Sequence, residues 1–421
     1  MRLSGKRLRI GSLAALATAL CAVAGFGQAT SVAAPHITLT AESYFNVPGQ
    51  IYSLNSYVQL FEKSHPGVTV KLTYVPFANL DTELLTQATA RDLPNLLAVD
   101  NPFVSTMIGT GQVIPLSSMK GFSAKGYYKS VIDEGLWKGK YYSLPVAGEN
   151  SIALTYNIPM LKAAGITPPT TWAQLVTDAK ALTTSSVQGM GLTCEAGEDT
   201  TWQWEPFFWG DGGKFDFSNI SSTPGTDAMT LYQTLINNGS ASKQCLQYSQ
   251  TPSVSTLFVD GKVAMMLNGP WNFNTYIAAG ENYGTYWGTA PVPVNKAGQK
   301  AVVPLGGEDW MISKSGGSAA EKAAFEFIEG MQTPAEELNL ANQFGYIPAR
   351  ISVAKEFVKA AGPAWAPFVN QTLYAHPRNV PLGVNYPKVS EAVWTAIQAV
   401  VSGTSVSSAL STAQSAISGI H

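Results

Sequence analysis

Sixteen residues crowd flat aromatic rings and carboxylates together in the stretch EDTTWQWEPFFWGDGG, residues 198–213. A hydrophobic core favours the rings and excludes the acids, whereas a solvated loop does the reverse. A ligand that is half apolar and half hydroxylated needs both, because C–H faces stack on rings and hydroxyls need fixed polar partners. The side chains with these properties are Trp202, Trp204, Trp209, Glu205 and Asp211. The alternative for each tryptophan is a place in a core.

Further candidate contacts follow predicted strands or glycines. Asp100 and Asn101 follow one predicted strand and Tyr44 follows another, although an Asp after a strand is also a common helix cap. Trp271 ends the segment NGPW, and the candidates beside glycines or predicted crossings are Glu149, Gly307, Glu308, Asp309, Trp310 and Tyr346. Glu308 could instead form an ion pair at a hinge, and Tyr346 could simply pack.

The charges near these segments bear on the ligand. The segments hold no Arg, and Lys214 is the only Lys near them. A phosphate needs fixed cations or helix amides, so a neutral ligand is expected. Acids beside rings also suit an organic cation such as a polyamine or a betaine. A receptor for such a cation, or for another small solute such as a glycerophosphodiester, stays open as the alternative.

No catalytic or metal-binding motif is present. The chain lacks Gly-x-Ser-x-Gly, and its four His are scattered without metal-ligand spacing. No catalytic residue, metal or cofactor is therefore expected. A carbohydrate hydrolase, which needs two acids flanking a bond, is the rival class.

The first 34 residues are predicted to be a signal peptide. Basic residues precede an apolar, Ala-rich run, and the small residues Ser31-Val32-Ala33 follow it. Removing this leader takes away four bases and no acids, which moves the formal charge from −2 to −6. A mildly acidic chain disfavours nucleic acid as a partner. Cys21 lies in the leader, and Cys194 and Cys245 are expected to pair as a disulfide in an exported protein.

The elements that position the candidates alternate between strand and helix. Apolar alternation predicts strands from residue 37 and at 68–74, and the run NLLAV (95–99) is typical of a buried parallel strand. Helices between them give an α/β order, in which ligands bind outside the carboxyl ends of the strands. Farther along, Thr171 and Gln174 predict a capping box, and the chain is expected to end in helices from 387 and 406.

Five motifs in order resemble the extracellular solute-binding proteins of ABC importers, in the group that binds maltose and trehalose. The segments are FEKSHPGVTVKL (61–72), WKGKYYSLPVAGENSIALTYN (137–157) with its continuation to 175, LFVDGKVAMMLNGPW (257–271), PLGGEDWMISKSG (304–316) and QFGYIPAR (343–350). Glu205-Pro206-Phe207 matches a Glu-Pro-aromatic step that stacks on sugar in these relatives, with Phe where Tyr is usual.

The resemblance implies two α/β lobes, each a mainly parallel sheet flanked by helices, with a ligand cleft between them. The lobes would be 35–148 plus 310–347 and 149–309 plus 348–421, joined by three hinge crossings. A sugar bridging both lobes would favour the closed form, which importer permease subunits would recognise. The protein is expected to be an exported monomer, in the periplasm or at the outer face of the cytoplasmic membrane. A cell-surface adhesin is a third class.

Overall fold

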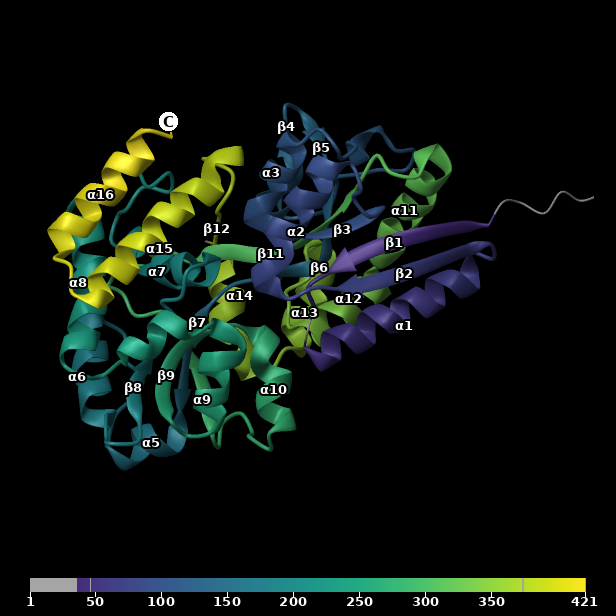
Figure 1. Ribbon diagram of the computed structural model, residues 1–421. Coiled ribbons are helices and arrows are strands. Elements are labelled where there is room, and N and C mark those ends of the chain that lie inside the picture. The colour runs from purple at the N-terminus through teal and green to yellow at the C-terminus, as the bar shows by residue number, and fades with distance from the viewer. Residues whose placement is uncertain (1–35, 46, 373–374, 421) are drawn as a thin grey trace, which may run out of the picture. The chain divides into compact units, whose positions relative to one another are not determined.

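The computed structural model describes residues 36–45, 47–372 and 375–420. The predicted leader, with Cys21, lies outside the described residues. The unit His36–His421 is α/β and contains two main sheets, each with its own hydrophobic clusters (Figure 1).

The first lobe is built on the sheet β12-β11-β3-β1-β2, with β6 pairing to β11. Strand β1 is parallel to both β2 and β3, as predicted, and β11 is antiparallel to β3. Its strands are β1 (Ile37–Ser43), β2 (Val68–Tyr74), β3 (Leu96–Asp100), β6 (Ser143–Asn150), β11 (Pro304–Ile312), β12 (His376–Pro377) and the hairpin β4 (Leu136–Trp137) and β5 (Lys140–Tyr141). Its helices are α1 (Pro48–Ser64), α2 (Phe77–Ala90), α3 (Val104–Gly109), α4 (Lys129–Ile132), α11 (Gly317–Met331) and α12 (Pro334–Phe344).

The burial of β3 explains its sequence. Every residue of this strand is buried. Leu96 and Ala98 pack in one hydrophobic cluster and Leu97 and Val99 in another, so both faces of the strand are covered and an apolar run replaces alternation. The strand ends at Asp100, and the 3-10 turn η1 (Asn101–Phe103) follows. Asp100 therefore stands at the carboxyl end of a central strand.

The second lobe is built on the sheet β10-β7-β9-β8. The expectation of a mainly parallel sheet is wrong here, since β7 is antiparallel to both β9 and β10 and only β8 and β9 run parallel. Its strands are β7 (Ala153–Asn157), β8 (Gln188–Gly191), β9 (Val263–Asn268) and β10 (Trp287–Ala290). The helices packed around it are α5 (Ile158–Ala163), α6 (Trp172–Leu182), α7 (Glu198–Gly210), α8 (Thr223–Asn237), α9 (Ser255–Val259), α10 (Phe273–Ala278), α13 (Ile351–Ala360), α14 (Ala366–Thr372), α15 (Tyr386–Ser402) and α16 (Val406–Ser418).

Local signals in this lobe act as predicted. Thr171 and Gln174 form the capping box of α6. Cys194 and Cys245 are joined by a disulfide, with their Cα atoms 4.9 Å apart. The stretch 198–213 is mostly the helix α7, which packs on α8 and α15.

The links between the lobes run through neighbouring strands. Ile347 and Glu149 exchange two backbone hydrogen bonds, of 2.7 and 2.8 Å, and Gly307 pairs with Glu149 in the ladder of β11 and β6. Glu149, Gly307 and Ile347 lie at or near the lobe boundaries that the resemblance implies, and both the boundaries and the three crossings stay a prediction. In the described part of the chain, none of the helices combines the length and apolarity needed to span a bilayer.

Candidate functional site

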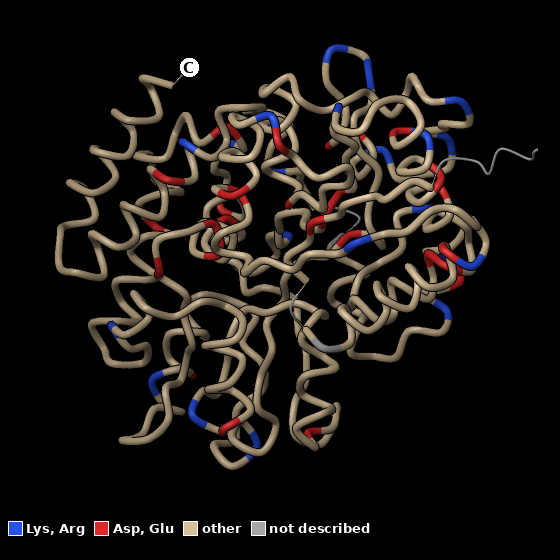
Figure 2. The backbone as a smooth tube through the Cα atoms, turned by 45° about the vertical axis from the view of Figure 1, so that its right-hand side comes forward, with Lys and Arg blue, Asp and Glu red and all other residues tan. Residues whose placement is uncertain are grey.

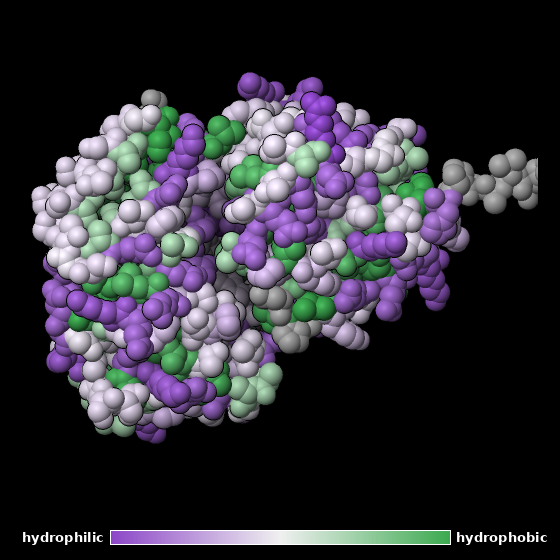
Figure 3. All heavy atoms as spheres, in the orientation of Figure 1, coloured by the Kyte–Doolittle hydropathy of each residue, from purple (hydrophilic) through white to green (hydrophobic). Residues whose placement is uncertain are grey.

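A cleft with about 720 Å³ of free space lies between residues of the two lobes. Figure 3 shows the surface hollowed at this place. The lining residues come from the strand ends of the first lobe, from the start of α7 and from the segments 250–251 and 271: Tyr44, Val47, Gln50, Phe77, Asp100, Asn150, Glu198, Asp199, Trp202, Gln250, Thr251, Trp271, Gly306, Gly307, Glu308, Tyr346 and Arg378.

Both lobes contribute aromatic rings to the cleft. Tyr44 and Phe77 lie 4.7 Å apart between ring centroids in the first lobe, and both are only partly buried. Trp271 of the second lobe is also partly buried and packs against the hydrophobic clusters of both lobes. These rings offer the apolar faces that the sequence predicted, on both sides of the space.

The two lobes approach closely beside Trp271. Gly345 ends α12 with φ +76°, and a Cβ there would lie 2.5 Å from the carbonyl oxygen of Pro270. Asn274 of α10 donates a 3.4 Å hydrogen bond to the carbonyl of Gln343. Glycine is therefore required at position 345 for this close approach.

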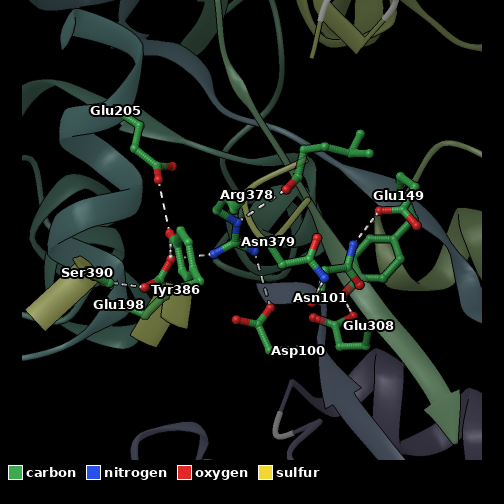
Figure 4. Close-up of polar contacts among 12 residues, drawn as sticks. Asp100, Asn101, Glu149, Glu198, Glu205, Glu308, Arg378, Asn379, Tyr386 and Ser390 are labelled. Atoms are coloured by element: carbon green, nitrogen blue, oxygen red, sulfur yellow. Dashed lines mark hydrogen bonds and ion pairs between the residues drawn. The ribbon is translucent and has the colours of Figure 1, made fainter. Parts of the chain in front are cut away.

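Arg378 is the main residue that sequence reasoning missed. None of the candidate segments holds an Arg, yet Arg378, which follows β12 directly, lines the cleft. Its guanidinium lies 4.5 Å from the centroid of the Trp202 ring, 2.6 Å from Glu198 Oε1 and 3.4 Å from Asp100 Oδ1 (Figure 4). Arg378 thus joins an acid of the first lobe to an acid of the second.

The first turn of α7 supplies the second lobe's acids. Glu198, Asp199 and Trp202 lie on one side of the helix because residues three and four apart are neighbours. Acids also suit this position because the N-terminal end of a helix carries a partial positive charge. Glu198 is held in place by Tyr386 Oη at 2.6 Å and Ser390 Oγ at 2.5 Å.

Burial makes several cleft acids weaker than usual. Loss of hydration raises the pKa of Asp100 to about 6, against the lowering effect of Arg378. Burial likewise raises the pKa of Asp199 to about 7 and that of Glu308 to about 8. Glu308 accepts a short hydrogen bond from Tyr346 Oη. Near neutral pH, Glu308 is therefore mostly a neutral carboxyl whose O–H can also donate a hydrogen bond to a ligand oxygen.

Three predicted contacts on α7 lie in the core of the second lobe and do not line the cleft. The Trp204 ring has no exposed surface and stacks on Phe208 with centroids 5.1 Å apart. Trp209 packs against Phe217, and Glu205 is buried beside Tyr386. The core alternative raised for the tryptophans therefore holds for Trp204 and Trp209.

Four more predicted contacts lie behind the cleft. Asn101 donates a 2.8 Å hydrogen bond to Glu149, and Ser143 donates one to Asp309. Trp310 is fully buried in the first lobe, where it packs on Phe327 with centroids 5.9 Å apart. The predicted residues that the structure does bring together on the cleft are Tyr44, Asp100, Trp202, Trp271, Gly307, Glu308 and Tyr346.

Acidic residues dominate the surroundings of the cleft. Figure 2 shows Asp and Glu along the central segments, whereas most Lys and Arg lie on peripheral loops and helix ends. Four acids and one Arg line the cleft. Within the described ranges, no grouping of three or more His, Cys, Asp or Glu side chains could hold a metal ion.

The family model for bacterial extracellular solute-binding proteins matches residues 56–366. The chain belongs to this family. The solute-binding protein is 26% identical over 279 residues to a binding protein of Brucella abortus, a match that covers 65% of this chain and 66% of that relative, just under two thirds of its length.

Two further similar proteins have sugar ligands. A maltodextrin-binding protein of Bacillus subtilis is 23% identical over 361 residues, which covers 81% of this solute-binding protein and 79% of the relative. A solute-binding protein of an ABC transporter from Thermotoga lettingae, solved with α-D-tagatose, superposes with a TM-score of 0.82 at 25% identity. That match covers 91% of this chain and 99% of the solved one. The two-lobed fold of these receptors is therefore the fold of this chain.

Proposed function

We propose that this protein is the substrate-binding component of an ABC importer and captures a neutral mono- or oligosaccharide between its lobes. One observation carries the proposal: rings from both lobes, Tyr44 and Phe77 on one side and Trp271 on the other, line one cleft together with carboxyl and amide groups. Ring faces suit the C–H surfaces of a pyranose, and the polar groups suit its hydroxyls. The relatives that bind maltodextrin and tagatose support the same ligand class.

Arg378 does not make the cleft an anion site. Its guanidinium already contacts two carboxylates, Asp100 and Glu198, so little positive charge remains for a phosphate. This supports a neutral ligand and disfavours a glycerophosphodiester. The surplus of acids keeps an organic cation as the second candidate.

The remaining parts of the proposal follow from the family. We infer an exported monomer, a signal peptide in residues 1–34, hinge closure of lobes 35–148 plus 310–347 and 149–309 plus 348–421, and docking of the closed form on importer permease subunits. We also propose that the protein binds without catalysis. Glu198 supports this, because contacts with Arg378, Tyr386 and Ser390 already engage both of its oxygens.

A thermal-shift screen of the chain without its leader tests the function. The panel holds mono- and oligosaccharides, polyols, polyamines, betaines and glycerophosphodiesters, and each saccharide is analysed afterwards for products. A native-state ligand at a hundredfold excess over its dissociation constant stabilises by about 2.7 kcal/mol. A saturable shift with an intact saccharide is the expected result. Shifts with cations alone, or cleavage of the saccharide, would contradict the proposal.

A further inference from the structure

Arg378 occupies the place in the cleft that a cationic ligand would take. An organic cation binds over an aromatic face beside carboxylates. In this cleft the ring is Trp202 and the carboxylates are Asp100 and Glu198, and the guanidinium of Arg378 already contacts all three. Arg378 is only 3% exposed, so the chain itself fills this position.

We propose that Arg378 is the specificity-determining residue of the cleft: a built-in cation that blocks organic cations and reserves the site for uncharged, hydroxylated ligands. The inference rests on the proposed saccharide function and adds the reason why an acidic, aromatic cleft would be selective for neutral molecules. Removal of the guanidinium should open a cation site at Trp202.

The neighbours of Arg378 hold it in this position. Besides contacting its two acids, Arg378 donates a 3.3 Å hydrogen bond from Nε to the carbonyl of Leu305 on β11. A guanidinium has five N–H donors, and its contacts with the described residues use three of them. With respect to the described residues, two donors remain for ligand oxygens. Arg378 can therefore bind hydroxyl oxygens while its charge is balanced by the protein.

The carboxylates would stay in place after the guanidinium is removed. Glu198 is held by Tyr386 and Ser390, and Asp100 ends a buried central strand. Asp199 and Glu308 line the same space. An Arg378→Met variant would thus present the Asp100 and Glu198 carboxylates and a freed Trp202 face without a cation.

A second arginine provides a matched control. Arg350 lies 4.6 Å over the ring of Tyr127, and its Nε is 3.7 Å from Glu337 Oε2. This site has the same three kinds of group as the Arg378 site, but none of its residues lines the cleft. Replacing Arg350 removes a guanidinium from an aromatic ring without opening a position for a ligand.

The test is isothermal calorimetry on the chain without its leader, using the saccharide identified in the screen and methylguanidinium or tetramethylammonium at millimolar concentration. Sodium chloride of equal ionic strength is the reference. Wild type should bind the saccharide and show no saturable cation binding. Arg378→Met should bind the saccharide at least tenfold more weakly, gain saturable cation binding, and recover part of its saccharide affinity when methylguanidinium is added.

Three further variants keep the outcome decisive. Arg378→Met with Glu198→Gln should lose the gained cation binding, and Arg350→Met should match wild type with both ligands. If Arg378→Met does not fold, Arg378→Lys replaces it in the test. This variant should bind the saccharide several-fold more weakly and still exclude the cations.

Each failure has its own signature. If Arg378→Met keeps its saccharide affinity and binds no cation, the role of Arg378 is overturned and the saccharide function stands. If Arg378→Met does not fold, unchanged saccharide affinity in Arg378→Lys has the same meaning. Wild type that binds cations and no saccharide would overturn the proposed function itself and, with it, the inference.

Discussion

Trp202 and Trp204 stand two residues apart on α7, yet they belong to different parts of the molecule. Trp202 lines the cleft under the Arg378 guanidinium, whereas Trp204 is enclosed in the core and stacks on Phe208. Two acids of the same helix also differ in their surroundings. Both contact the Tyr386 hydroxyl, but Glu198 lines the cleft and faces Arg378, whereas Glu205 is buried.

The helical period explains this division. Residues two apart on an α-helix point about 200° apart, so neighbouring rings face opposite surroundings. One face of α7 therefore carries the cleft groups Glu198, Asp199 and Trp202, and the rest of the helix fills the core. The two acids are seven residues apart, so they lie on the same side of the helix and both contact the Tyr386 hydroxyl. They differ because Glu198, in the first turn, also contacts the Arg378 cation.

The largest expected effect separates the two tryptophans. Trp204→Ala should lower the free energy of unfolding by about 3–5 kcal/mol, because it leaves a cavity in a core that cannot refill it. Ligand affinity of the folded fraction should stay at the wild-type value, since Trp204 does not line the cleft. Urea denaturation and calorimetry measure the two quantities. A large loss of affinity without a loss of stability would place Trp204 at the ligand instead.

The two acids should differ in the same experiment. Glu198→Gln should cost about 3 kcal/mol, because it leaves the buried Arg378 with one acid fewer. Glu205→Gln should cost less than about 1 kcal/mol at pH 7, because burial and the nearby Glu198 charge raise the pKa of Glu205 well above its usual value. A neutral Glu205 resembles glutamine in shape and hydrogen bonding. Equal losses in the two variants would contradict this division.

Much of the first lobe could be predicted from the sequence. The alternation at 68–74 and the apolar run at 95–99 encode an edge strand and a central strand, and burial dictates both patterns directly. The aromatic and acidic residues of α7 could be predicted only as one cluster, because no helix was predicted at 198–210. Helical spacing would have separated Trp202 from Trp204 and added Glu198 and Asp199 to the site.

Arg378 could not be predicted in this way. It lies in a short segment between α14 and α15, where no periodicity indicates a direction for its side chain. Its partners Glu198 and Asp100 lie 180 and 278 residues away in the sequence. Only the arrangement of both lobes brings the three together, so the local sequence carries no signal for this contact. Phe77, Gln250 and Thr251 were missed for the same reason.

Trp271, a cleft residue whose ring is partly exposed, should affect binding rather than folding. Trp271→Ala should weaken saccharide binding by about 2 kcal/mol, roughly thirtyfold, through loss of a buried ring face. The loss of stability should be smaller than for Trp204→Ala, because Trp271 is only partly buried. Calorimetry on the two variants side by side measures the contrast. A wild-type saccharide affinity in Trp271→Ala would contradict this contrast.

The smallest effect concerns Glu308, a cleft acid that has a tyrosine hydroxyl as its partner, as Glu205 does. Burial raises the pKa of Glu308 from 4.5 to about 8 in the folded protein. Between these values the folded state holds a proton that the unfolded state has lost. The stabilising contribution of Glu308 is therefore fully present below pH 4.5 and is lost as the pH rises through 8.

Denaturation at pH 5, 6, 7 and 8 measures this dependence. Glu308→Gln should make the fall in unfolding free energy with pH shallower by up to about 1.4 kcal/mol per pH unit, the maximum for one proton. Glu326→Gln, at the surface of α11 beside Lys322, is the control and should run parallel to wild type. If Glu308→Gln also runs parallel, Glu308 is ionised in the folded protein and belongs with Glu198, the acid that faces a cation.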